Sequence, residues 1–348
     1  MRITTYASGT GRQSQTIAAL RLAMAFARGQ PAFSFQSSGS TGPPKHVSFS
    51  RSQLVQVAEA TLQVGLNPSS TLVCLSAAMV GGAIGILRAM QFGQHLHLVA
   101  PVHNPLHYLA AGTQITLCSM VPLQVEHLFT DPTPKERQLL QGIGTVLVGG
   151  APLSQTLTGR IKASGLGHVF KQTYGMTETA SMVAWRSIDS PSEDYILLPN
   201  VSAGTDERGC LWVNRPELGQ IIQTNDVALY KSHPAPSFSL IGRADFIINS
   251  GGVKINPEAV EAAASGLLNG LATVLIGLPH PTLGTCAELV IEGPPLDPET
   301  LSQLHHALQR QLPPYHTPKQ MHCLERLPRL PSGKLDRLAL VQMFSSPA

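Results

Sequence analysis

Short strand-like segments alternate with helix-like segments through the first half of this chain. Apolar runs such as "TLVCLSA", "HLHLVAP" and "TVLVGG" are separated by segments with helical spacing of apolar residues, such as 13–28 and "AIGILRAMQFG". Strands that alternate with helices form a mostly parallel sheet with helices on its faces. We therefore expect an α/β fold, in which ligands bind outside the carboxyl ends of the strands.

The pattern changes after about Ser181. "GCLWVNR", "GQIIQTNDVALY" and "FSLIGRADFII" are typical of short antiparallel strands, and a helix, two strands and a second helix follow from Asn256 on. These patterns predict two domains. Residues 1–244 are expected to form a large N-terminal domain, with mostly parallel sheets flanked by helices plus a small β region, and residues 245–348 a small α+β domain.

Composition narrows the class of protein. The 348 residues are 43% hydrophobic and carry a formal net charge of +3, with Lys and Arg scattered along the chain. This charge distribution argues against nucleic acid or an anionic membrane surface as a partner. The longest apolar run, 77–87, is too short to cross a bilayer, and the first residues lack the apolar core of a signal peptide. The five cysteines form no CxxC pair, which favours reduced thiols and a cytoplasmic protein.

The stretch "SSGSTGPPK" at 37–45 combines glycines, hydroxyl side chains and a lysine. It is not a Walker A loop, because its glycines and lysine are spaced GxxGxxK and no Gly-Lys-Ser/Thr is present. Hydroxyl and amide donors with a nearby ammonium suit the β- and γ-phosphates of a nucleotide, although a Ser/Gly surface loop has the same composition. The candidate phosphate-binding residues are Ser37, Ser38, Gly39, Ser40, Thr41, Gly42 and Lys45.

Further polar motifs follow strands in a fixed order. "VLVGGAPLS" (146–154) ends a buried strand, and "QTYGMTETAS" (172–181) follows the next one and pairs Thr177 with Glu178. A hydroxyl can hold a phosphate oxygen while a carboxylate binds Mg²⁺. "TND" ends a strand on Asp226, which could accept both ribose hydroxyls, and "LPRLPSGKLDR" places Lys334 on a glycine-containing turn.

Together these motifs resemble the adenylate-forming superfamily, which contains acyl-CoA synthetases, peptide adenylation domains and firefly luciferase. "SSGSTGPPK" resembles its phosphate loop, "YGMTET" its nucleotide and Mg²⁺ motif, "GRADFIINSGG" its hinge and "PSGKLDR" its catalytic-lysine motif. The resemblance runs from about Phe33 to Arg337. Within the superfamily, "YGMTETAS", "INSGGVKI", "GILRAM" and "CSMVPLQ" look most like the o-succinylbenzoate–CoA ligases of menaquinone biosynthesis.

The resemblance implies a reaction in two halves, with ATP, Mg²⁺, CoA and a small carboxylic acid as cofactor and substrates. The acid would first attack ATP to give acyl-AMP and diphosphate, and CoA would then displace AMP. Most of the catalysis would come from a lysine held in position and from hydrogen-bond donors to the phosphate oxygens. The catalytic residues it implies are Lys334, Thr177 and Glu178, with Glu178 as the Mg²⁺ ligand.

The same resemblance assigns the binding residues. Lys45 and Thr177 would hold phosphate, and Asp226 and Arg243 the ribose. The small C-terminal domain would be mobile, and its rotation at Asp245 would separate the two half-reactions. The other residues implied to bind ATP or CoA are Gly149, Gly150, Ala151 and Pro152 beside the adenine, Tyr174 and Gly175 in the nucleotide motif, and Ser250, Gly251 and Gly252 beside the CoA arm.

The acid pocket is expected to need a cation, because o-succinylbenzoate keeps a second carboxylate when the first one reacts. Arg88, in the otherwise apolar helix "GAIGILRAM", is the candidate, although an arginine there could instead extend to solvent. Thr173 and Ser181 are further candidates for the acid site.

Some features depart from the superfamily pattern. The chain lacks most of the first subdomain of longer members, and Ala78 and Met79 stand where many relatives carry a histidine or aromatic gate. Three alternatives to an o-succinylbenzoate ligase therefore stay open: a CoA ligase for another aryl or fatty acid, an enzyme that loads a carrier protein, and a nucleotide-binding homologue that has lost catalysis. A homodimer is also possible.

Overall fold

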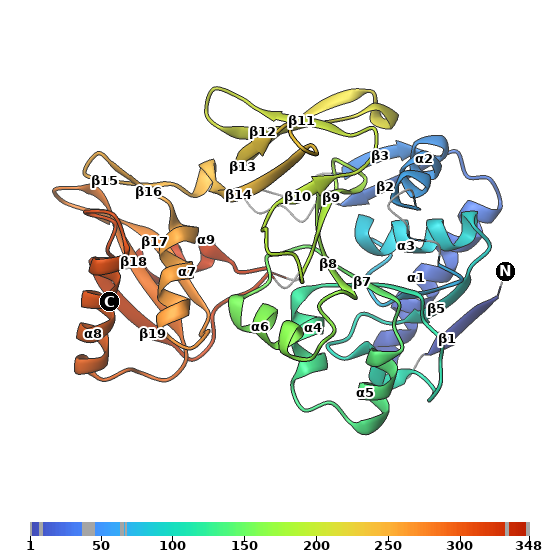
Figure 1. The fold of residues 1–348 in the computed structure, drawn as a ribbon, viewed down its shortest axis with the longest axis horizontal. Helices are drawn as coiled ribbons and strands as arrows, with labels where there is room; N and C mark the ends of the chain where they lie inside the picture. Colours follow the sequence, from blue (N-terminus) through green and yellow to red (C-terminus); the bar gives the residue numbers. More distant parts are fainter. Residues whose placement is uncertain are drawn as a thin grey trace.

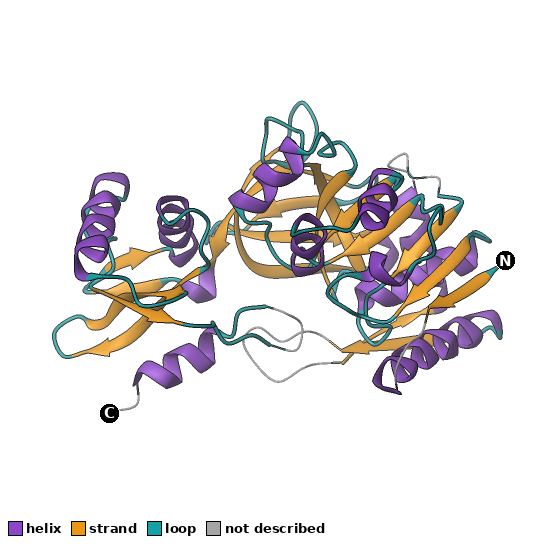
Figure 2. Cartoon of the chain, turned by 90° about the horizontal axis from the view of Figure 1, so that it is seen from below, coloured by secondary structure: helices purple, strands orange, loops and turns teal. Residues whose placement is uncertain are grey.

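The computed structural model describes residues 2–6, 10–36, 46–62, 66, 68–330 and 334–345. A single sheet of twelve strands forms the centre of the large part of the molecule (Figures 1 and 2). Its first half is parallel and follows the order β1 (Ile3–Tyr6), β5 (His95–Val99), β4 (Ser70–Val73), β6 (Leu117–Met120), β7 (Thr145–Val148) and β8 (Phe170–Met176).

The second half of this sheet is antiparallel. It continues from β8 through β9 (Ser181–Ser187), β10 (Tyr195–Leu197), β14 (Ser237–Arg243), β13 (Gln220–Lys231), β12 (Cys210–Arg215) and β11 (Ser202–Thr205). The change of direction occurs at the turn between β8 and β9. The expected α/β class and the antiparallel character of the later strands are therefore confirmed.

Helices pack on both faces of the parallel strands. They are α1 (Thr10–Ala27), α2 (Arg51–Leu62), α3 (Val80–Gln91), α4 (Pro122–Phe129), α5 (Pro134–Gln141) and α6 (Gln155–Ala163), with a 3₁₀ turn η1 (Pro105–Tyr108) between β5 and β6. One apolar cluster joins α4, α5 and α6 to the sheet through Leu72, Val146 and Phe170, all fully buried. A second joins α1 and α3 to the opposite face. None of the described helices is long and apolar enough to span a bilayer.

A hairpin of β2 (Ala32–Gln36) and β3 (His46–Ser50) lies apart from the central sheet and leads into α2. Ser50 caps this helix, as its sequence position predicts: its Oγ accepts from the amide of Gln53 at 3.2 Å, and its own amide donates to the Gln53 side chain at 2.9 Å. This reciprocal pair satisfies two backbone donors at the helix start. The stretch 37–45, with every predicted phosphate-loop residue, lies outside the described residues.

The small C-terminal part has its own layers (Figure 1). The 3₁₀ turn η3 (Ala244–Phe246) leads from β14 into a hairpin of β15 (Ile248–Ser250) and β16 (Val253–Ile255). A three-stranded sheet follows, of β17 (Thr273–His280), β18 (Gly284–Glu292) and β19 (Gln320–Leu324), with α7 (Pro257–Leu267), α8 (Pro298–Gln311) and α9 (Arg337–Ser345). Separate apolar clusters fill it. The division into domains at 244/245 stays a prediction.

Strand β1 was not expected from the sequence. It is short and polar, and it pairs with β5 at the edge of the sheet, where Thr4 bonds to His95 at 2.9 Å and Tyr6 to His97 at 3.1 Å. These histidines therefore serve as partners of an edge strand. A mixed segment of four residues carries too little periodicity to be recognised as a strand.

Close packing at the start of α3 gives a test of the fold. A Cβ on Gly82 would lie 2.3 Å from the backbone oxygen of Ser76, whereas a Cβ on Gly159 in α6 would meet no atom within 4 Å. We expect Gly82→Ala to lower the free energy of unfolding by about 1–3 kcal/mol, because the helix must shift. The matched Gly159→Ala should raise it by roughly 0.5–1 kcal/mol through helix propensity. Urea titrations compare the two; equal effects would contradict the packing described for α3.

Candidate active site

A cleft of about 3030 Å³ lies between the large and small parts of the molecule. The large part contributes the segments that follow β4, β6, β7 and β8, at their carboxyl ends, and the small part contributes α7 and the chain before α9. A single small ligand usually occupies about 300–1,000 Å³. The cleft therefore has room for several substrates at once, at the edge of the sheet where ligand binding was expected.

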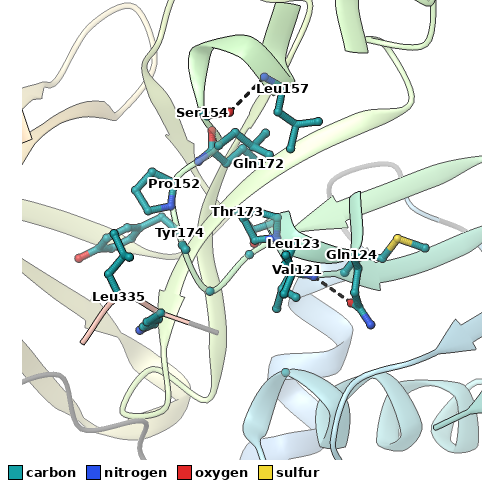
Figure 3. Close-up of a pocket in the computed structure, with 18 of the residues that line it drawn as sticks. Val121, Leu123, Gln124, Pro152, Ser154, Leu157, Gln172, Thr173, Tyr174 and Leu335 are labelled. Carbon is teal, nitrogen blue, oxygen red and sulfur yellow. Dashed lines mark hydrogen bonds between the residues drawn. The ribbon is translucent and has the colours of Figure 1, made fainter. Parts of the chain in front are cut away.

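The segment 149–152 forms one wall of the cleft. Gly149 and Gly150 follow β7, and Gly150 has a φ of +88°, which favours glycine. A Cβ on Gly149 would lie 2.7 Å from the Thr173 hydroxyl, so the two neighbouring strands approach closely here. Figure 3 shows Pro152 and Tyr174 facing the same cavity as Leu335 from the small part.

The turn from β8 to β9 carries Thr177 and Glu178, and both line the cleft. The turn closes on Thr179, whose hydroxyl bonds to the amide of Met176 at 2.9 Å and to the carbonyl oxygen of Ser181 at 2.6 Å. Ala180 and Ser181 have φ values of +54° and +128°, which non-glycine residues seldom adopt. Backbone held in this way is common at functional sites.

Asp226 and Arg243 face each other across β13 and β14, as paired residues of the two strands. Arg243 Nη1 donates to one Asp226 oxygen at 2.9 Å, and the Tyr174 hydroxyl donates to the other. Burial, followed by the charge of Asp226, raises the pKa of Tyr174, which therefore stays a hydrogen-bond donor. A carboxylate has about four acceptor positions, so Asp226 keeps capacity for ligand hydroxyls.

Lys334 lies in the cleft on the chain that leads from β19 to α9. Burial lowers the pKa of its ammonium group, as does the charge of Arg243, while Asp226 and Glu178 oppose the shift. These neighbours show that the lysine of the small part shares a site with the three charged residues predicted in the large part. The amide of Leu330 donates to the Lys334 carbonyl oxygen at 2.8 Å, which fixes the backbone there.

Arg88 is buried in α3 with only 2% of its surface exposed, and it lines the same cleft. The alternative that this side chain extends to solvent is therefore wrong, because the helix packs with Arg88 facing inward. Burial lowers its pKa to about 10, so it keeps its charge at neutral pH. Its Nε and Nη2 have no hydrogen-bond partner among the described residues.

The remaining predicted residues fall into two groups. Thr173 and Ser181 line the cleft, and the Thr173 hydroxyl donates to the carbonyl oxygen of Val148 at 3.1 Å. Ser250, Gly251 and Gly252 lie at the β15–β16 turn, where Gly251 donates to the Leu283 carbonyl oxygen at 3.1 Å, and they are not among the residues that line the cleft. Their predicted contact with the CoA arm stays a prediction.

Sequence reasoning missed the charged residues that α7 contributes. Glu258 and Glu261 line the cleft, and Arg337 binds Glu261 through two bonds of 2.7 Å each. Arg243 and Arg337 also lie over the Phe246 ring, 5.2 and 5.0 Å from its centre. The "NPEAVE" pattern predicted the helix start, but it gives no sign that the first turn faces the cleft.

Comparison with known proteins decides the family. A model of the AMP-binding enzyme family matches residues 8–205, which is more than half of the chain. The chain belongs to this family. It is an AMP-forming acyl-CoA ligase. Its cleft brings together the two carboxylates of Asp226 and Glu178 with the cationic side chains of Arg243 and Lys334.

Among relatives of the ligase, a probable 2-succinylbenzoate–CoA ligase from Mycobacterium tuberculosis is 27% identical over 90% of this chain and 84% of its own length. A solved acyl-CoA synthetase (AMP-forming)/AMP-acid ligase II-like protein from Dyadobacter fermentans is 32% identical, with 97% of each chain covered and a TM-score of 0.60. The o-succinylbenzoate CoA synthetase of Bacillus subtilis, solved with an acyl-adenylate intermediate, shares the fold at 19% identity, with 88% of this chain and 68% of that chain covered and a TM-score of 0.72.

Glu258 gives the ligase a group that titrates near neutral pH. Burial, followed by the charges of Glu261 and Asp226, raises the pKa of this carboxyl to about 7, although the charges of Arg337 and Arg243 oppose the shift. A carboxyl whose pKa is higher in the folded state stabilises the fold below its unfolded pKa of about 4.5, and this stabilisation is lost as the pH rises through about 7.

Glu258→Gln mimics the protonated form and should keep the stabilisation at all pH values. We compare the free energy of unfolding of Glu258→Gln with that of the unsubstituted ligase. We expect the difference to grow in favour of the variant by about 1–2 kcal/mol between pH 5 and pH 8. This energy is smaller than the full pKa shift implies, because Glu258 is partly exposed and solvent screens its charge. Urea titrations at pH 5, 6.5 and 8 measure it. The exposed Glu59→Gln in α2 is the control and should show little pH dependence. A difference that stays constant with pH would contradict the burial of Glu258.

Proposed function

We propose that this ligase converts o-succinylbenzoate, ATP and CoA into o-succinylbenzoyl-CoA, AMP and diphosphate, through an acyl-AMP intermediate. One observation carries the choice of acid. Arg88 presents a fully buried guanidinium to the cleft, and two of its nitrogens have no hydrogen-bond partner among the described residues. A substrate with a second carboxylate would supply that partner.

The energetics of Arg88 favour an anionic ligand. An arginine without a counter-ion in an apolar environment is destabilising by several kcal/mol, so it is seldom kept without a role. Its planar fork matches a carboxylate through two parallel hydrogen bonds. A fatty acid has only the carboxylate that reacts, and it would leave Arg88 unpaired. The names of the relatives from Mycobacterium tuberculosis and Bacillus subtilis support the same acid.

In the first half-reaction, a carboxylate oxygen of the acid attacks the α-phosphorus of ATP, and the bond from that phosphorus to the diphosphate oxygen breaks. Lys334 would lie between the carboxylate and the α-phosphate and offset the charge that develops there. Thr177 and Lys45 would bind phosphate oxygens, and Asp226 and Arg243 would hold the ribose. Glu178 would hold Mg²⁺, which offsets phosphate charge when bound.

In the second half-reaction, the CoA sulfur attacks the acyl carbon, the bond from that carbon to the AMP oxygen breaks, and the thiol proton is released to solvent. Lys334 would have to leave before CoA could approach. A rotation at Asp245 would remove it, since a few backbone dihedrals in a short connection can absorb such a motion. Ser250, Gly251 and Gly252 would then approach the acyl group.

The acid can be identified by CoA-dependent release of AMP from ATP and Mg²⁺. The panel holds o-succinylbenzoate, benzoate, 4-coumarate and a medium-chain fatty acid. We expect turnover with o-succinylbenzoate, and a loss of about 100-fold or more in Lys334→Ala, because the transition state loses a cation. Turnover only with another acid would keep the ligase and discard this substrate. Nucleotide binding without any turnover would favour a homologue that has lost catalysis.

Arg88 can be tested by replacing its charge with an apolar chain of similar length. We expect Arg88→Met to lower kcat/KM for o-succinylbenzoate by about 100-fold, a size typical of a lost buried charge pair. Its activity with any acid that has a single carboxylate should fall much less. Arg208→Met, at an exposed arginine paired with Asp206 outside the cleft, is the control and should behave like the unsubstituted ligase. An equal loss for all acids would remove Arg88 from the acid pocket.

A further inference from the structure

Arg215 is the other fully buried arginine of the described residues, with 0% of its surface exposed. It ends β12, and its Nη1 donates to two carbonyl oxygens, those of Thr179 and Met182, each at 3.0 Å. Its Nη2 donates to the carbonyl oxygen of Val57 in α2 at 3.4 Å. One guanidinium therefore joins three segments that are far apart in the sequence.

Of the two carbonyls at 3.0 Å, that of Thr179 belongs to the turn that carries Thr177 and Glu178, and that of Met182 lies at the start of β9. They flank Ala180 and Ser181, whose positive φ values are unfavourable for residues with a side chain. The Ala180 methyl group is buried in a cluster with Val57 of α2 and Leu218 just beyond β12. Since strained backbone persists only where its surroundings hold it, Arg215 is one of the groups that keep this turn in place.

Stability alone does not explain an arginine at this position. The nearest carboxylate, Glu217, is 3.7 Å from Nε, and neither that nitrogen nor Glu217 Oε2 has a hydrogen-bond partner among the residues that the structure describes. Burial lowers the pKa of Arg215 to about 10, so the buried group is still charged at neutral pH. An apolar side chain of similar volume is often as stabilising as a buried charge, or more so. What an apolar side chain lacks is a rigid set of donors with fixed directions.

We propose that Arg215 is a positioning residue for adenylation, and that it fixes the Thr177–Glu178 turn relative to α2 in the orientation that binds ATP with Mg²⁺. The inference rests on the proposed roles of Thr177 and Glu178. Arg215 itself touches no substrate. Its effect passes through the Thr179 and Met182 carbonyls to the turn, so its loss should weaken metal-dependent binding of ATP and leave the fold largely intact.

Calorimetric titration of ATP, with and without saturating Mg²⁺ and with no acid present, tests this without knowledge of the substrate. We expect the gain in ATP affinity on adding Mg²⁺ to fall about tenfold in Arg215→Met, the size typical of losing a group that orients a metal ligand. Arg215→Lys should recover part of the gain, because it keeps the charge but not the planar fork. Glu178→Gln, which alters the proposed ligand itself, should lose at least as much.

Val213→Ala is the matched control for stability. Val213 is fully buried on β12 two residues before Arg215, so its truncation weakens the same strand but leaves the Arg215 bonds to Thr179 and Met182 in place. It should lower the melting temperature but leave the Mg²⁺ effect unchanged. If Arg215→Met folds and shows a normal Mg²⁺ effect while Glu178→Gln is impaired, the role of Arg215 alone is overturned. If Arg215→Met does not fold, the same result with Arg215→Lys overturns it. A normal Mg²⁺ effect in Glu178→Gln would instead refute the proposed site, and the inference with it.

Discussion

The turn between β8 and β9 is the constraint on which the site depends. At this point the sheet changes from parallel to antiparallel, and the chain can reverse so tightly only because residue 175 is glycine. A Cβ on Gly175 would lie 2.3 Å from the Ser181 carbonyl oxygen. The close approach leaves Thr177 and Glu178 at the rim of the sheet, beside the ends of the parallel strands. The same turn that ends one half of the sheet therefore presents its polar side chains to the cleft.

The antiparallel half of the sheet supplies the link to the small part. The register of β13 and β14 places Asp226 opposite Arg243, and Arg243 also binds the two oxygens of Asp245 at 2.9 and 2.7 Å. Beyond Asp245, the Phe246 ring contacts the guanidinium groups of both Arg243 and Arg337, and Arg337 follows Lys334 by three residues. A continuous series of contacts thus runs from Asp226 to the segment that carries Lys334. The position of that lysine depends on pairs that lie outside any single motif.

Much of this organisation could be predicted from the sequence, because it depends on local patterns. Alternating apolar runs identified the parallel strands, and glycines and polar residues at strand ends identified the cleft residues at 149–152, Thr177, Glu178 and Asp226. Lys334 was identified by the resemblance of "PSGKLDR" to a family motif. What could not be predicted depends on contacts distant in sequence. Glu258 was recognised only as part of a helix start, since which face of α7 meets the cleft follows from tertiary packing. The alternation of side chains along "CLWVNR" could have revealed that Arg215 is buried. Arg215 lies on the same face of the strand as Leu211 and Val213, which are both buried.

Arg88 and Arg215 are both buried and charged, but their guanidinium groups have different partners. Both have pKa values near 10 through burial, and both keep their charge at neutral pH. Arg215 uses its Nη1 and Nη2 on backbone carbonyls, which are fixed acceptors present in the folded chain at all times. Arg88 faces the cleft with two nitrogens that no described residue satisfies. Because a buried donor without an acceptor is destabilising, the first arrangement organises the protein, and the second becomes favourable only when an anion enters the cleft.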